Sequence, residues 1–181
     1  MTFNKFIGDY KFDPEANPAI FTEFQVGALR VFDSFIPPNI FRFNPDQASQ
    51  IGTIKYKDAI KNPELINKTS IAEYISGASS GMIKTKTVEL IDDLRDSFIT
   101  SELPNQETDL YSINLQRGRD HGVGSLKDIR EALGLSPANI SQAFIHQPRL
   151  DCLQALYQNP DNIDLWLALI GEQPESMTAL G

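Results

Sequence analysis

The sequence predicts a mostly α-helical protein with long connecting loops. Apolar residues recur at three- and four-residue spacing in several segments, which is the pattern of helices that bury one face. No segment of useful length alternates apolar and polar residues as a half-buried strand does. Prolines and polar stretches separate the helical segments, and no repeat or linker divides the chain. We therefore expect residues 1–181 to form a single domain.

The first expected helix follows an irregular lead over residues 1–19. Its apolar positions fall on one face and are Phe21, Phe24, Ala28, Val31 and Phe35. The pair Pro37-Pro38 ends this helix, because proline cannot continue the hydrogen-bond ladder. Residues 39–68 hold few periodic apolar positions, so we expect a surface loop with short turns there.

Three further helices are expected in the middle of the chain. Ser70 and Glu73 have the spacing of a capping box, which predicts a short helix to about Ser79. Residues 87–99 predict a second helix, whose apolar face consists of Val88, Ile91, Leu94 and Phe98. Residues 108–120 predict a third helix, which carries the densest run of hydrogen-bonding side chains in the sequence.

The last part of the chain predicts three more helices. One starts at Ser125, and Gly134 is its expected C-terminal cap. Its inward positions are expected to be Leu126, Ile129 and Leu133. Two helices over residues 148–158 and 161–170 follow, separated by Asn159-Pro160.

Composition narrows the classes of partner and environment. The net charge is −8 and the basic residues form no cluster, so neither nucleic acid nor an anionic membrane is a favoured partner. Cys152 is the single cysteine, which excludes an internal disulfide. No apolar run follows Met1 as in a signal peptide, and no stretch approaches the length of a membrane span. Sequons at Asn67 and Asn139 permit an extracellular location.

The segment from Asn114 to Gly122 carries the candidate chemistry. Asn114 and Arg117 are three residues apart and share a helix face, and Asp120 and His121 follow Arg117 at the same spacing. From the residues alone two interpretations stay open. One is a buried salt-bridge network that ties helices together, and the other is a site that holds an anionic group.

The same segment resembles the signature of the animal haem peroxidase family. It reads Asn114-Leu115-Gln116-Arg117-Gly118-Arg119-Asp120-His121-Gly122. Further similarities occur in the family's order, at Gly8-Asp9-Tyr10, Asn17-Pro18-Ala19-Ile20, Glu23-Phe24, Asp92-Asp93-Leu94-Arg95 and Ile163-Asp164-Leu165-Trp166. The resemblance implies a partial, mostly α-helical peroxidase fold and haem as the cofactor of the family.

The resemblance also assigns residues to the haem site. The first helix aligns with the family's proximal helix, in which Asp33 stands at the position of the histidine that ligates iron and Phe32 at that of a glycine. Asn114 matches the asparagine that accepts a hydrogen bond from that histidine. Arg30 and Arg117 match arginines that lie near the haem propionates. Our candidate cofactor-binding residues are therefore Arg30, Asp33, Asn114 and Arg117, with Asp33 at the metal position.

Neither histidine of the chain is expected to replace the ligand. His121 belongs to the family signature, where its role is structural, and His146 precedes a helix start, where a surface or capping role is expected. The family's distal histidine and arginine lie in a part of the domain that precedes the matched part. We therefore expect a central-to-late piece of the fold, without catalytic residues of its own.

Two functions follow as hypotheses. The first is a peroxidase-like interaction or structural module that lacks haem catalysis, as in the peroxidase-like domain of dual oxidases, which the Phe35-Ile36-Pro37-Pro38 stretch resembles. The alternative is a haem-dependent peroxidase that reduces hydrogen peroxide while oxidising a small donor, as in a response to oxidative stress. An unrelated helical binding protein would not explain the ordered similarities. The expected partner is another protein or a second copy, held through exposed apolar helix faces. The resemblance implies an extracellular location.

Overall fold

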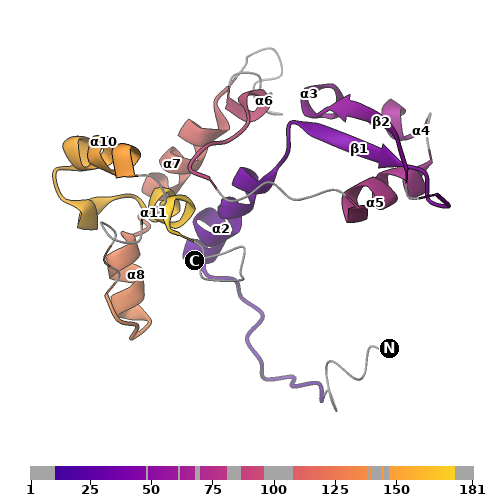
Figure 1. The fold of residues 1–181 in the computed structure, drawn as a ribbon. Coiled ribbons are helices and arrows are strands. Elements are labelled where there is room, and N and C mark those ends of the chain that lie inside the picture. Colours follow the sequence, from indigo (N-terminus) through magenta and orange to yellow (C-terminus); the bar gives the residue numbers. More distant parts are fainter. Residues whose placement is uncertain are drawn as a thin grey trace.

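The structure is a computed structural model of the chain. It describes residues 11–47, 49–60, 62–67, 70–80, 87–95, 108–137, 139, 144 and 147–173. Figure 1 shows a two-stranded hairpin with short helices at one end and a group of helices at the other. A helical segment, formed by α2 (Thr22–Val26) and η1 (Ala28–Phe35), lies between them. The mostly helical class predicted from the sequence is confirmed.

The segment predicted as one helix from residue 21 onward is broken into two kinds of helix. α2 is an α-helix, whereas η1 is a 3₁₀-helix, and Gly27 joins them. A Cβ atom at Gly27 would lie 2.7 Å from the Glu23 carbonyl oxygen and 2.6 Å from Leu165 Cδ2, so the backbone of α2 and the side chain of Leu165 together favour glycine at this position. Gly27 has φ and ψ angles of −106° and −82°, and helical periodicity does not reveal this break.

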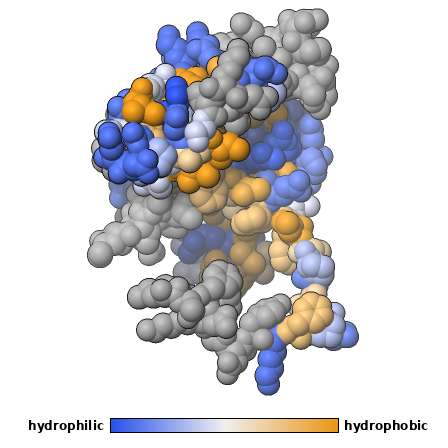
Figure 2. All heavy atoms as spheres, turned by 90° about the vertical axis from the view of Figure 1, so that its right-hand side faces the viewer, coloured by the Kyte–Doolittle hydropathy of each residue, from blue (hydrophilic) through white to orange (hydrophobic). Residues whose placement is uncertain are grey.

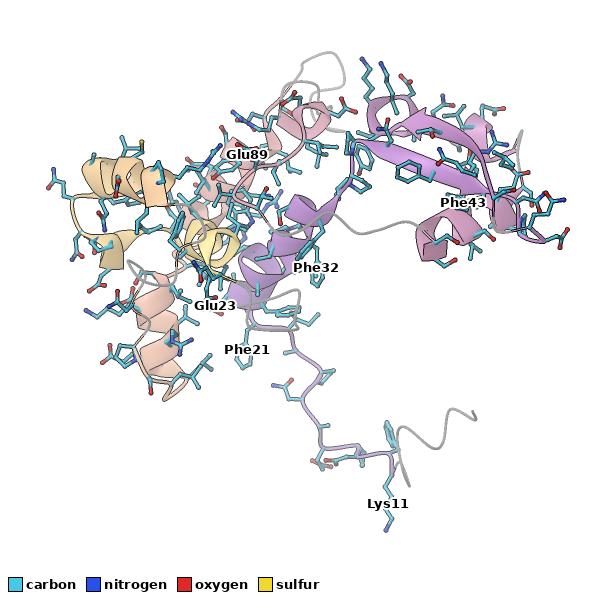
Figure 3. All side chains as sticks on the ribbon, viewed as in Figure 1. Lys11, Phe21, Glu23, Phe32, Phe43 and Glu89 are labelled. Atoms are coloured by element: carbon cyan, nitrogen blue, oxygen red, sulfur yellow. The ribbon has the colours of Figure 1, made fainter. Side chains whose placement is uncertain are left out.

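The predicted apolar face of this segment is only partly buried. Val31 and Phe35 belong to the core, as expected. Phe21 and Phe24 do not, since 79% and 49% of their surfaces are exposed. In Figure 3, Phe21 and Phe32 project away from the helices that cover the other side. Figure 2 shows apolar side chains gathered in a band across the middle of this side of the molecule.

The prediction of a loop over residues 39–68 is wrong. β1 (Asn39–Phe43) and β2 (Gln50–Lys55) form an antiparallel hairpin, which the short helices α3 (Tyr56–Ala59) and α4 (Glu64–Asn67) follow. The register places Ile40 opposite Ile54 and Phe41 opposite Thr53. These short strands lack strict alternation, and a two-stranded ribbon needs support from outside, so the local pattern did not indicate them.

Helix α5 (Ile71–Ser80) supplies that support and confirms the predicted helix. The Ser70 hydroxyl accepts a hydrogen bond from the Ala72 amide at its start. The Glu73 carboxylate, expected to close the capping box, instead accepts a hydrogen bond from Arg42 Nε of β1 at 3.0 Å. Gly77 lies against the strand so closely that a Cβ atom would be 1.9 Å from the Phe41 carbonyl oxygen.

The helix predicted over residues 87–99 is shorter in the structure. α6 spans Asp92–Arg95, and residues 87–91 before it are not helical. Its apolar residues are nevertheless buried as predicted, including Val88, Ile91 and Leu94. The predicted position of Phe98 lies outside the described residues.

The next two predicted helices are confirmed. α7 spans Leu110–Asp120 and is capped by the Asp109 carboxylate. α8 spans Leu126–Ala132 and starts with a complete capping box between Ser125 and Asp128. Gly134 has a φ angle of 68°, as expected of a C-terminal glycine. The inward orientation predicted for Leu133 is wrong, because 66% of its surface is exposed.

The C-terminal helices complete the core. α10 spans Gln147–Tyr157 and η2 spans Pro160–Asn162. α11 spans Leu165–Gly171 and begins later than the predicted residue 161. It packs against η1, α7 and α8 and buries Leu165, Trp166, Leu167, Ala168 and Ile170. Within the described ranges, no helix has the length and apolar character that crossing a membrane requires.

Candidate functional site

A chain of hydrogen bonds connects η1 with α7. The Asn114 side chain is fully buried on α7, and its Nδ2 donates to Asp33 Oδ2 at 2.8 Å. Arg117 Nη1 donates to Asn114 Oδ1 at 3.1 Å. The amide therefore uses its donor toward one element and its acceptor toward a guanidinium on its own helix.

The two helix types explain how these side chains meet. A 3₁₀-helix has three residues per turn, so side chains three apart are eclipsed and form rows along it. Val31 and Ser34 form a buried row, whereas Arg30 and Asp33 form a half-buried row. On α7, Asn114 and Arg117 are also three apart and share a face. The four candidate residues from the sequence therefore gather where these two rows face each other.

Burial and charge act against each other at Asp33. Burial raises the pKa of its carboxyl above 3.8, while the hydrogen bond from Asn114 and the positive charges of Arg30 and Arg117 act to lower it. The desolvation effect is larger, so the pKa is raised overall. The ionised carboxylate is thus held in a place that disfavours its charge.

The two arginines share this single carboxylate without pairing directly with it. The pKa of Arg117 is lowered by burial and by the charge of Arg30, although Asp33 acts in the opposite direction. The Arg30 Nε is buried and has no hydrogen-bond partner in the described part of the chain. Among the described residues, the ion pairs within 4 Å involve neither arginine. The cluster therefore carries an excess of positive charge.

Tyr56 is a member of this neighbourhood that the sequence did not reveal. It begins α3 directly after the hairpin and packs against the core. Burial raises the pKa of its phenol, and the negative charge of Asp33 raises it further. Residues 39–68 were expected to form a loop, so no local signal placed this tyrosine beside Asp33.

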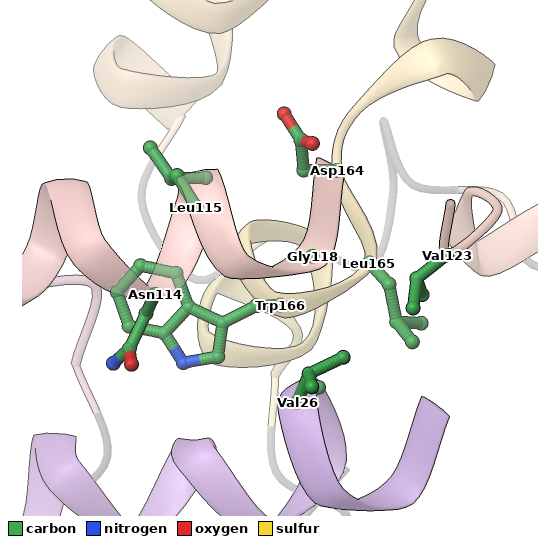
Figure 4. Close-up of a pocket in the computed structure, with 9 residues that line it drawn as sticks. Val26, Asn114, Leu115, Gly118, Val123, Asp164, Leu165 and Trp166 are labelled. Carbon is green, nitrogen blue, oxygen red and sulfur yellow. The ribbon is translucent and has the colours of Figure 1, made fainter. Parts of the chain in front are cut away.

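Behind Asn114 lies a small crevice between α2, α7 and α11 (Figure 4). The Trp166 indole forms one side of it and meets the Tyr111 ring edge to face, with 4.7 Å between centroids. The Trp166 Nε1 is buried without a hydrogen-bond partner among the described residues. The crevice is lined by Val26, Gly27, Asn114, Leu115, Gly118, Val123, Asp164, Leu165 and Trp166.

A second polar network fixes α11 to the end of α7. Arg119 binds both oxygens of Asp164, at 3.1 and 2.7 Å, and the Tyr157 hydroxyl donates to the same carboxylate. Burial acts to raise the pKa of Asp164, but the hydrogen bonds from Arg119 and Tyr157 outweigh it, so the pKa is lowered. This carboxylate is therefore stabilised as an anion, in contrast to Asp33.

The other polar residues of the signature lie apart from the cluster. Asp120 accepts a hydrogen bond from Gln116 at the exposed end of α7. His121 is the C-cap of that helix, and its Nδ1 lies 2.8 Å from the Arg117 carbonyl oxygen. His146 lies outside the described residues. Across the described ranges, no three histidine, cysteine or acidic side chains converge as a metal site does.

Two solved structures with a similar fold are a peroxidase and a fatty acid α-dioxygenase. Peroxidase A of Dictyostelium discoideum superposes with a TM-score of 0.80 and 25% sequence identity, over 95% of this chain and 34% of that chain. A fatty acid α-dioxygenase of Arabidopsis thaliana superposes with a TM-score of 0.67 and 18% identity, over 84% of this chain and 27% of that one. The latter comparison supports the fold alone.

Proteins of similar sequence are also peroxidases or peroxidasins by name. Human thyroid peroxidase is 31% identical over 94% of this chain, and a peroxidasin homologue of Caenorhabditis elegans is 29% identical over 99% of it. The matched part makes up 19% and 14% of those relatives, so the chain spans a small part of their length. The model of the family described as animal haem peroxidase matches residues 1–181. This protein therefore belongs to the animal haem peroxidase family.

Proposed function

We propose that this chain is a peroxidase-like domain that does not ligate haem iron and serves as an interaction or structural module. In this role residues 1–181 form a single partial domain. The observation that carries it is the hydrogen bond at Asp33, the residue that we place by resemblance at the position of the family's iron-ligating histidine. Its carboxylate accepts a hydrogen bond from the buried Asn114 at 2.8 Å.

The donor atom at this site differs from the one that ligates haem iron in the family. The imidazole nitrogen is the proximal donor in haem peroxidases, whereas Asp33 offers a carboxylate oxygen. The described histidine, His121, is exposed and lies against the Arg117 carbonyl oxygen at the end of α7. We therefore derive no reaction step through haem in this chain.

The same contacts stabilise the shape of the domain without the cofactor. Asp33, Asn114 and Arg117 join η1 to α7 through side chains alone. Hydrogen bonds between side chains of two elements fix the relative positions of those elements. A scaffold held in this way suits a module whose role is to present surfaces.

A second candidate function is haem-dependent peroxidase activity within a longer assembly. The observation that favours it is the pair Arg30 and Arg117, whose guanidinium groups have no ion-pair partner among the described residues. Such groups suit carboxylates, so they are the residues that would hold the haem propionates. Hydrogen peroxide and a small donor would then be the substrates, as in a response to oxidative stress.

Titration of the purified chain with haem, followed by visible absorption, distinguishes these candidates. We expect no Soret shift for the native chain and a shifted, sharp band for Asp33→His, which restores an imidazole. Asp46→His is the matched control, because Asp46 is exposed in the turn between β1 and β2. Stoichiometric binding by the native chain would refute the proposal and make peroxide turnover the next assay.

An extracellular location is part of the proposal. Asn139, the first residue of a sequon, is exposed after α8. Expression through a secretory pathway should therefore yield a chain that an N-glycosidase converts to a smaller species. Asn139→Gln should reduce that shift, and an unmodified secreted chain would speak against this location.

A further inference from the structure

The side-chain amide of Asn114 has two ends with opposite hydrogen-bonding character, and both ends are in use. Its Nδ2 donates to Asp33 Oδ2 at 2.8 Å, and its Oδ1 accepts from Arg117 Nη1 at 3.1 Å. The Asn114 side chain is fully buried on α7. The direction in which this amide points is therefore set by contacts inside the described part of the chain.

The two partners of Asn114 permit one direction of its amide. A guanidinium has N–H donors and no acceptor, whereas an ionised carboxylate has acceptors and no donor. If the amide turned over, its NH₂ group would face Arg117 and its carbonyl oxygen would face the Asp33 carboxylate. Both hydrogen bonds would be lost, and a buried amide without partners is costly. Arg117 thus directs the N–H side of Asn114 toward position 33.

The other polar groups near position 33 have the same polarity. The positive charges of Arg30 and Arg117 both act on the Asp33 carboxyl. Tyr56 lies close enough for the charge of Asp33 to act on its phenol, whose hydroxyl is a further donor. Groups that can donate hydrogen bonds therefore come to this position from η1, α7 and α3.

We propose that Arg117, acting through Asn114, makes position 33 selective for a side chain that accepts a hydrogen bond. Arg117 is a positioning residue in this role, since it contacts the amide and forms no ion pair within 4 Å among the described residues. The inference deepens the proposed haem-free role and rests on its assignment of Asp33 to the position of the ligand histidine. In the family that histidine donates to its asparagine, which is the opposite polarity.

This selectivity has a consequence for an imidazole at position 33. A neutral imidazole has one N–H group and one nitrogen with a free lone pair. In Asp33→His, Nδ1 takes the place of a carboxylate oxygen, because both atoms are bonded to Cγ. Facing the N–H side of Asn114, Nδ1 accepts and the proton lies on Nε2. A nitrogen binds a metal only without its proton, so ligation through Nε2 by this variant requires the Asn114 amide to turn over.

¹⁵N NMR spectroscopy of the imidazole without haem tests the proposal on the full chain. His121 and His146 give the signals of the native chain, so an additional signal belongs to position 33. Above the ordinary imidazole pKa of about 6.5, we expect Asp33→His to carry its proton on Nε2. Adding Asn114→Asp supplies a carboxylate of the same shape that accepts from both neighbours, so the proton should move to Nδ1. Adding Arg117→Met instead should raise the Nδ1–H share, because the amide is then free to turn.

Gln116→Glu in the Asp33→His background is the matched control. It makes the same change from amide to acid on α7, but Gln116 is exposed and its amide donates to Asp120. The tautomer should stay as in Asp33→His alone. A proton on Nδ1 in Asp33→His, or a tautomer that Asn114→Asp or Arg117→Met leaves unchanged, would overturn the proposal.

If circular dichroism shows that Asp33→His is unfolded, the native chain provides a second measurement. The Asn114 amide signal, identified by its absence in Asn114→Ala, should shift as Asp33 titrates and should exchange slowly with solvent. An amide signal that does not respond to this titration would overturn the proposal. None of these samples contains haem, so the Soret titration described above reports failure of the haem-free role separately.

Discussion

Asn114 holds the two halves of the candidate site together, because its amide donates to Asp33 and accepts from Arg117. Asn114→Ala would leave the half-buried carboxylate and the guanidinium without this bridge. We expect a loss of roughly 2–4 kcal/mol in the free energy of unfolding, since charged groups lose their hydrogen-bond partner. Urea denaturation of both proteins measures the difference.

Gln116→Ala on the same helix is the control. Gln116 is exposed and its side-chain amide donates to Asp120 at the surface. Its replacement should change the free energy of unfolding by less than about 0.5 kcal/mol. Equal losses in the free energy of unfolding for the two substitutions would show that the Asn114 hydrogen bonds stabilise the chain no more than those of an exposed side chain.

Asp33 and Asp164 are expected to give opposite pH dependences. The pKa of Asp33 is raised in the folded chain, mainly by burial. Its contribution to stability is therefore present below its ordinary pKa of 3.8 and is lost as the pH rises through the raised value. Asp33→Asn should thus gain stability over the native chain as the pH rises from 3.5 toward 7, measured by denaturation at each pH.

For Asp164 the sign reverses. Hydrogen bonds from Arg119 and Tyr157 lower its pKa against the effect of burial, so its contribution is present above 3.8 and is lost as the pH falls through the lowered value. Asp164→Asn should cost roughly 1 kcal/mol at pH 7, because water screens the half-exposed Arg119. The cost should shrink on acidification, and a cost that grows instead would contradict this assignment.

At the scale of elements, two glycines should respond to alanine in opposite ways. At Gly77 a Cβ atom would lie 1.9 Å from the Phe41 carbonyl oxygen, where α5 packs on β1. At Gly118, in the interior of α7, no atom outside the neighbouring residues and the nearby backbone of its own helix lies within 4 Å of such a Cβ. Gly77→Ala should destabilise the chain by roughly 1–3 kcal/mol through overpacking.

Gly118→Ala should stabilise the chain by roughly 0.5–1 kcal/mol, because alanine has the higher helix propensity. Thermal unfolding of both variants followed by circular dichroism compares them. A loss of stability in Gly118→Ala would mean that the crevice beside α7 is tighter than the contacts indicate.

The sequence predicted those elements whose signals are local. α7 and α8 start at capping residues that are recognisable in sequence, and Gly134 ends the latter as expected. The break at Gly27 was not predicted, because the apolar periodicity continues through it while the backbone there departs from helical geometry. The hairpin was not predicted because its support comes from α5, through the hydrogen bond between Arg42 and Glu73, and not from its own sequence pattern.

The candidate site was predictable to the extent that it follows family motifs. Arg30, Asp33, Asn114 and Arg117 were selected from resemblance, and the structure brings them together. Tyr56 was not selected, because nothing in its neighbouring residues distinguishes it from a loop tyrosine. The direct Asn114–Asp33 hydrogen bond also depends on tertiary geometry, which spacing along the chain does not contain.

At the scale of the whole molecule, the fold is open rather than compact. The hairpin with α5 and the group formed by α7, α8, α10 and α11 lie at opposite ends of the α2–η1 segment (Figure 1). The chain corresponds to 34% of the superposed Dictyostelium peroxidase. In this arrangement Phe21 and Phe24 of the α2–η1 segment stay exposed, with 79% and 49% of their surfaces accessible.

The most direct test of the central claim is the haem content of the native chain after expression in cells supplied with a haem precursor. The pyridine haemochrome assay gives the molar ratio of haem to protein without any added variant or ligand. Our account predicts a ratio near zero, because Asp33 is bound to Asn114 and offers no imidazole. A ratio near one would contradict it and would identify the chain as a haem-binding member of its family.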